Sequence, residues 1–225
     1  MTPRLPSGFE RIGIVTGLEA EARIARRLGR MVAVGGGTSD GAKAAAGMLA
    51  DQGATALVSF GLAGGLDPTL APGALLVPGS VLIAGARLAT DPALSRALGG
   101  PTITCLLGAD GIAATASGKG LLWRETGCAA LDLESGAVAD VARAHSLPFA
   151  VLRAVCDPAG MDLPPAALLA LAANGRIAPA RILGAVLRDP AQIPALWRLG
   201  QAASRARATL ARQVGAIQAP LRMGR

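Results

Sequence analysis

Short apolar runs alternate with alanine-rich stretches along most of the chain, and this alternation is the feature that most constrains its fold. A wholly apolar run of roughly four to eight residues is typical of a strand that is buried on both faces of a sheet. Strands of this kind that alternate with helices predict an α/β domain with a largely parallel sheet, covered by helices on both sides. The apolar runs lie at residues 12–16, 31–34, 56–60, 75–83, 103–107, 129–133 and 149–156.

Helices are expected between these runs, where alanine and leucine are dense. Thr38, Ser39 and Asp40 precede one such stretch and are residue types that commonly cap the start of a helix. The run at 75–83 follows the run at 56–60 without room for a helix, so we expect a mixed sheet. The expected helices cover residues 19–28, from the cap at 38–40 to about 52, 113–126, 135–145 and 165–173.

The chain changes character after Pro164 and Pro165. Residues 164–220 contain no convincing strand, and within residues 190–217 apolar side chains recur every three or four positions. This spacing predicts an amphipathic helix. No sharp linker separates this part from the rest, so we expect a single domain over residues 1–225, with a core at about 11–160 and a helical C-terminal part at 164–220.

Composition removes several function classes. Hydrophobic residues make up 52% of the 225 residues and charged residues 16%, which excludes a disordered chain. Aromatic residues make up only 2%, and because sequence-tolerant nucleic-acid binding relies on aromatic stacking, no nucleic-acid partner is expected. The net charge of +7 favours an anionic partner such as a phosphate or an acidic lipid, although an arginine-rich composition alone would produce the same charge.

Cysteine and histidine usage narrows the chemistry further. The three cysteines are odd in number and lack C-x-x-C spacing, which argues against a disulfide framework and a cysteine-rich zinc site. His145 is the single histidine, so a metal site with several histidines is excluded. We therefore expect no metal and no cofactor, a reducing cytoplasmic location, and carboxylates as the acid–base groups of any enzyme.

Targeting signals are not expected. The first ten residues hold no apolar stretch of the kind found in a signal peptide. The chain also lacks any window of about 18 uninterrupted apolar residues, the length that would predict a membrane-spanning helix.

Residues suited to a binding site follow four of the predicted strands. Ligands in α/β sheets bind at the carboxyl ends of strands, so we expect these residues to meet at one edge of the sheet. Each also has a plain structural explanation, because acidic residues suit a helix start and glycine suits a turn. Their shared placement favours a site. They are Glu19 and Glu21, the small-residue run at 61–65, Asp132 with Glu134, and Asp157.

Five sequence segments, taken in order, resemble a known family. They read IGIVTGLEAE at 12–21, SFGLAGGLDP at 59–68, PGALLV at 72–77, DLESGAVA at 132–139 and RAVCD at 153–157. Together they resemble the nucleoside phosphorylase superfamily, in particular its methylthioadenosine/S-adenosylhomocysteine nucleosidase branch, over about residues 11–160. Residues 163–196 resemble more narrowly the hopanoid-associated phosphorylase subgroup.

The resemblance implies a fold and an activity. The fold is a three-layer α/β/α arrangement with a mixed central sheet and a helical C-terminal segment. The activity is cleavage of the purine N-glycosidic bond, in the hopanoid subgroup that of adenosylhopane during hopanoid biosynthesis. Members of the family form homo-oligomers, in which a partner subunit often completes the site.

The resemblance also implies roles for individual residues. Asp157 matches the general acid at the purine N7, with Cys156 beside it, and Glu21 matches the carboxylate that activates the attacking water. Glu134 matches the carboxylate that holds the ribose hydroxyls, and Leu133 packs beside the sugar. The loop next to the nucleophile and ribose corresponds to Leu62, Ala63 and Gly64 within residues 61–65.

Two departures from the family pattern bear on the nucleophile. Leu62 stands where the nucleosidases usually carry a serine or threonine, which makes the site more apolar. The first loop is acidic where the phosphorylases place an arginine for phosphate, so a phosphate would need Arg23, Arg87 or an arginine of a partner subunit. Water activated by Glu21 needs no such cation and is therefore favoured. Asp157 would have to be protonated to act as an acid, a form that the apolar end of its strand would favour.

Two other functions remain open at this stage. One is a nucleosidase or phosphorylase that acts on soluble nucleosides such as methylthioadenosine or S-adenosylhomocysteine. The other is a non-catalytic nucleoside-binding protein, against which the joint presence of Glu21, Glu134 and Asp157 argues. If the substrate is a lipid, the helix at 190–217 would contact the inner face of the membrane, with Leu196 and Trp197 in the interface and nearby arginines at the headgroups. Those arginines are Arg198, Arg205 and Arg207.

Overall fold

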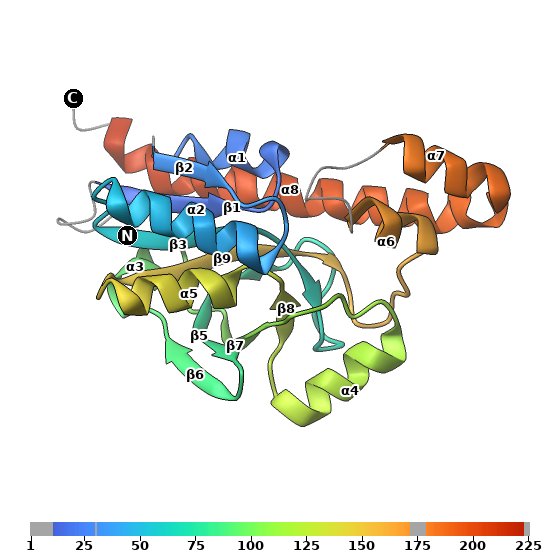
Figure 1. Ribbon diagram of the computed structural model, residues 1–225, viewed down its shortest axis with the longest axis horizontal. Helices are drawn as coiled ribbons and strands as arrows, with labels where there is room; N and C mark the ends of the chain where they lie inside the picture. Colours follow the sequence, from blue (N-terminus) through green and yellow to red (C-terminus); the bar gives the residue numbers. More distant parts are fainter. Residues whose placement is uncertain (1–10, 30, 172–178, 223–225) are drawn as a thin grey trace.

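The computed structural model, which describes residues 11–29, 31–171 and 179–222, consists of a mixed central sheet between two layers of helices (Figure 1). The strands are β1 (Ile12–Thr16), β2 (Met31–Val34), β3 (Ala56–Gly65), β4 (Leu75–Leu76), β5 (Pro78–Ile83), β6 (Ala86–Ala89), β7 (Ile103–Gly108), β8 (Ala130–Asp132) and β9 (Phe149–Asp157). The helices are α1 (Glu19–Ala25), α2 (Ser39–Asp51), α3 (Pro92–Ala97), α4 (Ala116–Thr126), α5 (Ser135–Ala144), α6 (Pro165–Leu171), α7 (Pro179–Arg188) and α8 (Ile193–Arg222), with a short 3₁₀ helix at Pro190–Gln192. The expected α/β architecture with a mixed sheet is therefore confirmed.

The sheet is built around the long strand β3. The strand order is β2-β1-β3-β8-β7-β5-β6, and β9 pairs with β3 and with β4. Strands β2, β1, β3 and β9 run parallel, whereas β8 pairs antiparallel with the last two residues of β3, Gly64 and Gly65. The end of β8 consequently reaches the site from the opposite direction to β1 and β9.

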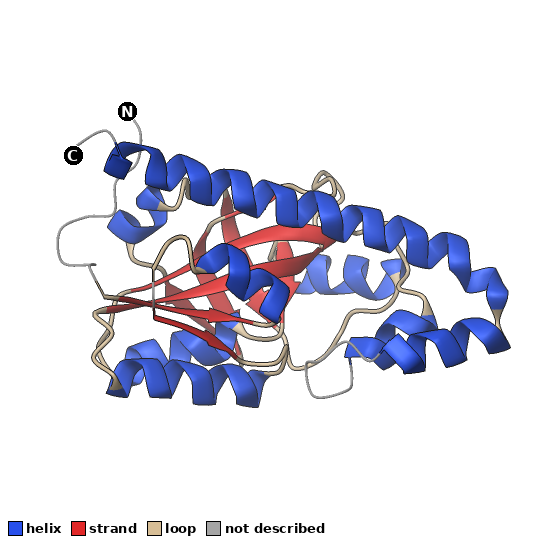
Figure 2. Cartoon of the chain, turned by 90° about the horizontal axis from the view of Figure 1, so that it is seen from above, coloured by secondary structure: helices blue, strands red, loops and turns tan. Residues whose placement is uncertain are grey.

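Alternate residues of the central strands point to opposite faces, as the pleat of a sheet requires. Helices α2 and α5 pack on one face and helices α1, α3 and α8 on the other (Figure 2). The first face buries Val15, Leu57 and Val151, and the second buries their neighbours Ile14, Val58 and Leu152. Burial on both faces explains why these strands read as wholly apolar runs.

Most predicted elements occur close to their predicted positions, and the differences have physical reasons. The run at 61–65 was expected to leave the strand, but it continues β3 because its small residues let β9 and β8 pair closely on either side. The predicted strand at 75–83 is divided into β4 and β5. The hairpin partner β6 and the short helix α3 were not predicted, and helix α1 ends at Ala25 instead of residue 28.

The predicted amphipathic helix is α8, which packs along β9 and extends beyond the sheet (Figure 2). Ala206, Leu210, Val214 and Ile217 are buried as the periodicity predicts. Ile193, in the same periodic series, is exposed because the N-terminal end of α8 lies beside α7 outside the sheet. No helix within the described ranges is long and apolar enough to cross a bilayer. The first ten residues, for which no signal peptide is expected, and the predicted helix end at 172–173 lie outside the described residues.

Candidate active site

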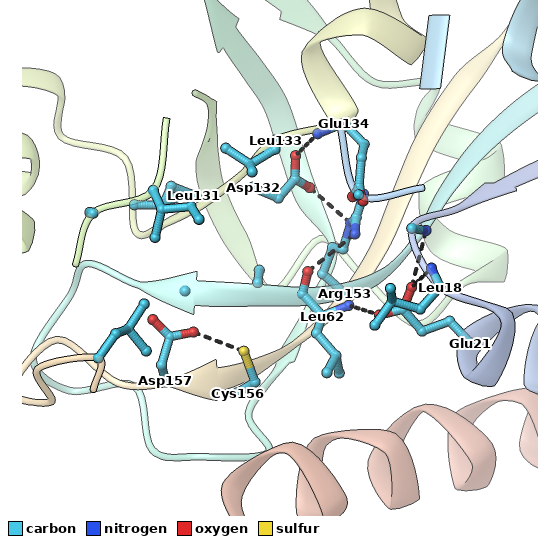
Figure 3. A pocket seen from close by; sticks show the side chains of 17 residues that line it. Leu18, Glu21, Leu62, Leu131, Asp132, Leu133, Glu134, Arg153, Cys156 and Asp157 are labelled. Atoms are coloured by element: carbon cyan, nitrogen blue, oxygen red, sulfur yellow. Dashed lines mark hydrogen bonds and ion pairs between the residues drawn. The ribbon is translucent and has the colours of Figure 1, made fainter. Parts of the chain in front are cut away.

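A pocket lies where the ends of β1, β3, β8 and β9 meet (Figure 3). The strands supply its floor, the first turn of α1 supplies one side, and the segments before α4 and before α6 supply the rim. Its lining includes Gly17, Leu18, Glu21, Leu62, Ala63, Gly64, Ile112, Ala113, Leu131, Asp132, Leu133, Glu134, Arg153, Cys156, Asp157 and Leu163.

Glu21 is held rigidly by backbone amides. Its Oε2 atom accepts hydrogen bonds from the backbone N–H groups of Gly17 (3.1 Å) and Leu18 (2.9 Å), and its Oε1 atom accepts one from Leu62 (3.2 Å). The first two contacts satisfy N–H groups at the start of α1, which have no partner within the helix. The third joins α1 to β3, so the carboxylate is fixed between two elements.

Arg153 lies at the centre of a second group of charges. Its Nη2 atom is 2.6 Å from Glu134 Oε2, and its Nε atom is 2.8 Å from Asp132 Oδ2. It also donates hydrogen bonds to Ser59 Oγ (2.6 Å) and to the Leu62 carbonyl (3.1 Å). This buried cation therefore orients the end of β8 against the middle of β3.

The charges around Arg153 are unbalanced in favour of the carboxylates. Burial, together with the charges of Asp132 and Glu21, raises the pKa of Glu134 to about 7 against the opposing effect of Arg153. Burial also raises the pKa of Glu21, against the opposing effects of Arg153 and of the backbone amides. Burial alone would lower the pKa of Arg153, but the three carboxylates outweigh it and raise that pKa.

Two glycines make this close approach of carboxylates possible. A Cβ atom on Gly17 would lie 2.2 Å from Glu134 Oε1 and 3.3 Å from Glu21 Oε2. A Cβ atom on Gly61 would lie 2.8 Å from Glu21 Oε2 and 2.7 Å from Arg153 Nη1. The three distances below 3.0 Å are shorter than real Cβ contacts, so the glycines admit charged groups that a side chain would displace.

Asp157 forms the other end of the pocket, where its surroundings differ from the expected apolar ones. The Sγ atom of Cys156 donates to Asp157 Oδ1 (2.8 Å), and Nζ of Lys119 lies 2.8 Å from Oδ2. A neighbouring cation favours the ionised form of a carboxylate, the opposite of what an apolar strand end does. The thiol is affected in turn, because burial, followed by the charge of Asp157, raises the pKa of Cys156.

The family of the chain follows from a comparison with protein-family models. Residues 24–188 match the model of the phosphorylase superfamily. The chain belongs to this superfamily. The match includes Glu134 and Asp157 and confirms the expectation of an enzyme that cleaves N-glycosidic bonds.

Solved structures with the same fold are similar over nearly the whole chain. The 5′-methylthioadenosine/S-adenosylhomocysteine nucleosidase of Neisseria meningitidis, in complex with methylthio-immucillin-A, has a TM-score of 0.67 at 16% identity and covers 92% of this chain and 97% of its own. The corresponding Helicobacter pylori nucleosidase has a TM-score of 0.68 at 15% identity, and the match covers 94% of this chain and 98% of the nucleosidase chain. Futalosine hydrolase of Helicobacter pylori has a TM-score of 0.67 at 15% identity, with 96% and 97% covered. At these identities the likeness establishes the fold. No curated protein matches the chain in sequence.

The pocket of this superfamily member brings together most of the residues that the sequence singled out. It does not include the two arginines proposed for phosphate. Arg23 is exposed because it is two residues after Glu21 and so points away from the pocket side of α1. Arg87 is on β6, where its guanidinium donates to the Thr126 carbonyl. The residues brought together are Glu21, Leu62, Ala63, Gly64, Leu133, Glu134, Cys156 and Asp157.

Three charged residues of the site received no role from the sequence. Arg153 is a cation in the middle of an otherwise apolar strand, and this unusual position is a signal that could have revealed it. Asp132 was noted beside Glu134, but its contact with Arg153 depends on how β8 meets β3. Lys119 carries no local signal, because its pairing with Asp157 joins residues 38 positions apart.

All three cysteines are free. Within the described ranges, no group of three or more His, Cys, Asp or Glu side chains is arranged to hold a metal ion.

Proposed function

We propose that this protein releases adenine from an adenosyl compound by cleaving the bond between adenine and ribose, with adenosylhopane as the first candidate substrate. The observation that carries the proposal is that Glu21, Glu134 and Asp157 line one pocket, with Leu133 beside Glu134. A non-catalytic nucleoside-binding protein would have no need for three partly desolvated carboxylates around one ligand.

The positions of the carboxylates fit the charges that develop in this reaction. As the bond breaks, the ribosyl ring becomes positive and the purine becomes negative. Glu134 and Glu21 lie on the side of the pocket where they would stabilise the sugar, and Asp157 lies at the other end, where it would protonate N7. Proton transfer by a positioned group contributes roughly 10²–10⁴-fold to a rate.

Water is the nucleophile that the pocket supports best. Arg153 is the one cationic side chain among the described lining residues, and it is already occupied by Asp132 and Glu134. A phosphate would enter beside two carboxylates with no free cation to receive it. Glu21, whose pKa is raised by burial, suits the role of a base that takes a proton from water.

The apolar part of the wall supports a substrate with an apolar 5′ group. Leu18, Leu62, Ile112 and Leu163 come from four separate segments and line the same pocket. A lipid such as adenosylhopane would place its hydrocarbon body along this side. Methylthioadenosine and S-adenosylhomocysteine carry smaller 5′ groups and are the alternative substrates.

Adenine release from adenosine, methylthioadenosine and adenosylhopane, measured side by side, tests the proposal. We expect adenine from all three and the highest kcat/KM with the lipid. Equal or higher kcat/KM with methylthioadenosine would assign the enzyme to soluble nucleosides. Failure to release adenine from any of them would overturn the proposed function.

The nucleophile is tested separately by titrating phosphate into a phosphate-free reaction. We expect adenine at full rate without phosphate and an unphosphorylated sugar product. A strict requirement for phosphate, with a ribosyl 1-phosphate product, would contradict hydrolysis.

A lipid substrate would require contact with a membrane, and the end of the α7–α8 pair is suited to it. Leu187 and Trp197 are 74% and 69% exposed, and Arg188 and Arg198 are exposed beside them. Apolar side chains flanked by arginines favour the surface of an anionic bilayer. The expected contact is therefore restricted to this end, since the remainder of α8 packs on the sheet.

The proposed location is therefore the cytoplasm, with peripheral contact at the inner face of the membrane. Flotation with liposomes tests this contact. Binding should require anionic lipid, should fall with added salt, and should weaken in Trp197→Ser. Lack of binding to anionic liposomes at low salt would reject it.

The family resemblance further supports a homo-oligomer, and light scattering of the purified protein would decide between monomer and assembly.

A further inference from the structure

Lys119 has no place in the function proposed above, although its environment is among the most unusual in the molecule. Its side chain is completely buried in the first turns of α4. Besides the contact with Asp157 Oδ2, its Nζ atom donates to the carbonyl oxygens of Pro158 (3.1 Å) and Met161 (2.9 Å). Burying a lysine is costly unless its charge is paired and its protons are accepted, and here both conditions are met.

These contacts fix the acid and the loop behind it as one unit. Lys119 has four acceptors, because the backbone carbonyl of Asp157 also lies within reach (3.4 Å), and all four belong to residues 157–161, at the end of β9 and directly after it. The same loop is joined to α4 a second time, because Asp162 Oδ1 accepts a hydrogen bond of 2.6 Å from the backbone N–H of Ala116. Asp157 is therefore positioned from α4 as well as from its own strand.

The pairing also determines the charge that a substrate meets. Two titratable groups contact Asp157, Lys119 of α4 and Cys156 of β9, while Glu21 of α1 acts on the thiol of Cys156. The lysine and the thiol each direct a hydrogen towards one carboxylate oxygen, an arrangement that suits an ionised carboxylate. The N7 atom of an N9-substituted adenine carries a lone pair and no hydrogen, and an anionic carboxylate would repel it.

From this geometry we infer that Lys119 is a positioning residue that keeps Asp157 ionised in the empty site, so that nucleoside binding takes up one proton from solvent. The inference rests on the proposed function. The proton enters on Asp157 and forms the hydrogen bond to N7. During cleavage the O–H bond of Asp157 breaks, the N7–H bond forms and the C–N bond breaks, which restores the Asp157–Lys119 pair. The attacking water returns one proton through Glu21, so the reaction overall consumes water alone.

Calorimetry with a carbocyclic adenosine tests the inference, because a methylene group in place of the ring oxygen prevents cleavage. Binding is measured at pH 7 in PIPES and in Tris, whose protonation enthalpies differ. Wild-type protein should take up close to one proton per site. Lys119→Arg should retain this uptake, Lys119→Met should lose most of it, and Lys43→Met, which changes the chain's other lysine on the exposed side of α2, should behave as wild type.

The pH profile of kcat/KM gives a readout that loss of structure would not produce. The alkaline limb of Lys119→Met should move by about one to three pH units to higher pH, because the cation that favours the ionised carboxylate is gone. Binding of the analogue by wild-type protein without proton uptake would overturn the inference, whether or not Lys119→Met folds. Failure of the analogue to bind at all would instead overturn the proposed function, and the inference with it.

Discussion

Arg153 shows how one residue can determine the charge balance of a pocket. It is a single buried cation among three buried carboxylates, which outnumber it. Removing one partner of such a group has a larger effect than its hydrogen bond alone would suggest, because the remaining charges lose their compensation. Removing the charge of Glu134 should have the opposite effect on stability, because Glu134 is one of the carboxylates that outnumber the cation.

The pH dependence of stability should reveal this excess charge. The pKa of Glu134 is about 7 in the folded protein against an ordinary value of 4.5. Between these values the folded protein keeps a proton that the unfolded chain has lost, so stability falls as pH rises through this window. Glu134→Gln removes the effect, and its Tm relative to wild type should therefore rise from pH 4.5 to 7 and level off above. A Tm difference independent of pH, as expected for the exposed control Glu125→Gln, would contradict the assignment.

The same substitution should have a second effect on catalysis. Glu134→Gln should lower kcat/KM by roughly ten- to hundredfold, which corresponds to the loss of hydrogen bonds to a charged group. With a 2′- or 3′-deoxy substrate the penalty should be smaller, because one ribose hydroxyl is already missing. An equal penalty on the hydroxylated and the deoxy substrate would remove Glu134 from the ribose site.

At the scale of elements, the site depends on how closely β1, β3 and β8 approach one another. Gly17, at the turn between β1 and α1, is the point where Glu21 and Glu134 come nearest to a common backbone position. A methyl group there must displace at least one carboxylate, although the turn itself could still form.

Gly17→Ala should therefore leave the fold intact and reduce kcat/KM by about a hundredfold, the loss that a displacement of about 1 Å can cause. The matched control is Gly47→Ala in α2, where a Cβ atom would have no neighbour within 4 Å. The control should keep full activity and gain up to about 1 kcal/mol in the free energy of unfolding, because alanine favours a helix over glycine. Full activity in Gly17→Ala would show that the two carboxylates need not be close.

The elements also show what the sequence could and could not predict. β1 and β9 were predictable because burial on both faces produces runs that are almost wholly apolar, and α2 because Thr38 caps it. The extension of β3 through residues 61–65 could not be predicted, since glycine-rich segments usually form turns. Of the site, the carboxylates could be identified because they follow strands directly. The ion pairs could not be predicted, because Arg153–Asp132 and Lys119–Asp157 join segments that only the antiparallel docking of β8 and the packing of α4 bring together.

At the scale of the molecule, a helical pair projects from the core that holds the pocket. The sheet and its two helical layers hold the pocket, while α7 and the N-terminal end of α8 extend away from it with exposed leucines, Trp197 and arginines (Figure 2). This arrangement would allow a lipid substrate to be approached at a surface while its adenosyl group reaches the pocket.

The most direct test of the central claim is the rate of adenine release by wild-type protein and by Asp157→Asn under the same conditions. Asparagine has nearly the same shape as aspartate but cannot transfer a carboxylic proton to N7. We expect adenine release to fall by roughly 10²–10⁴-fold in Asp157→Asn, with unchanged circular dichroism. Turnover of the variant within a few-fold of wild type would show that Asp157 is a turn residue at the end of β9 and would contradict the account.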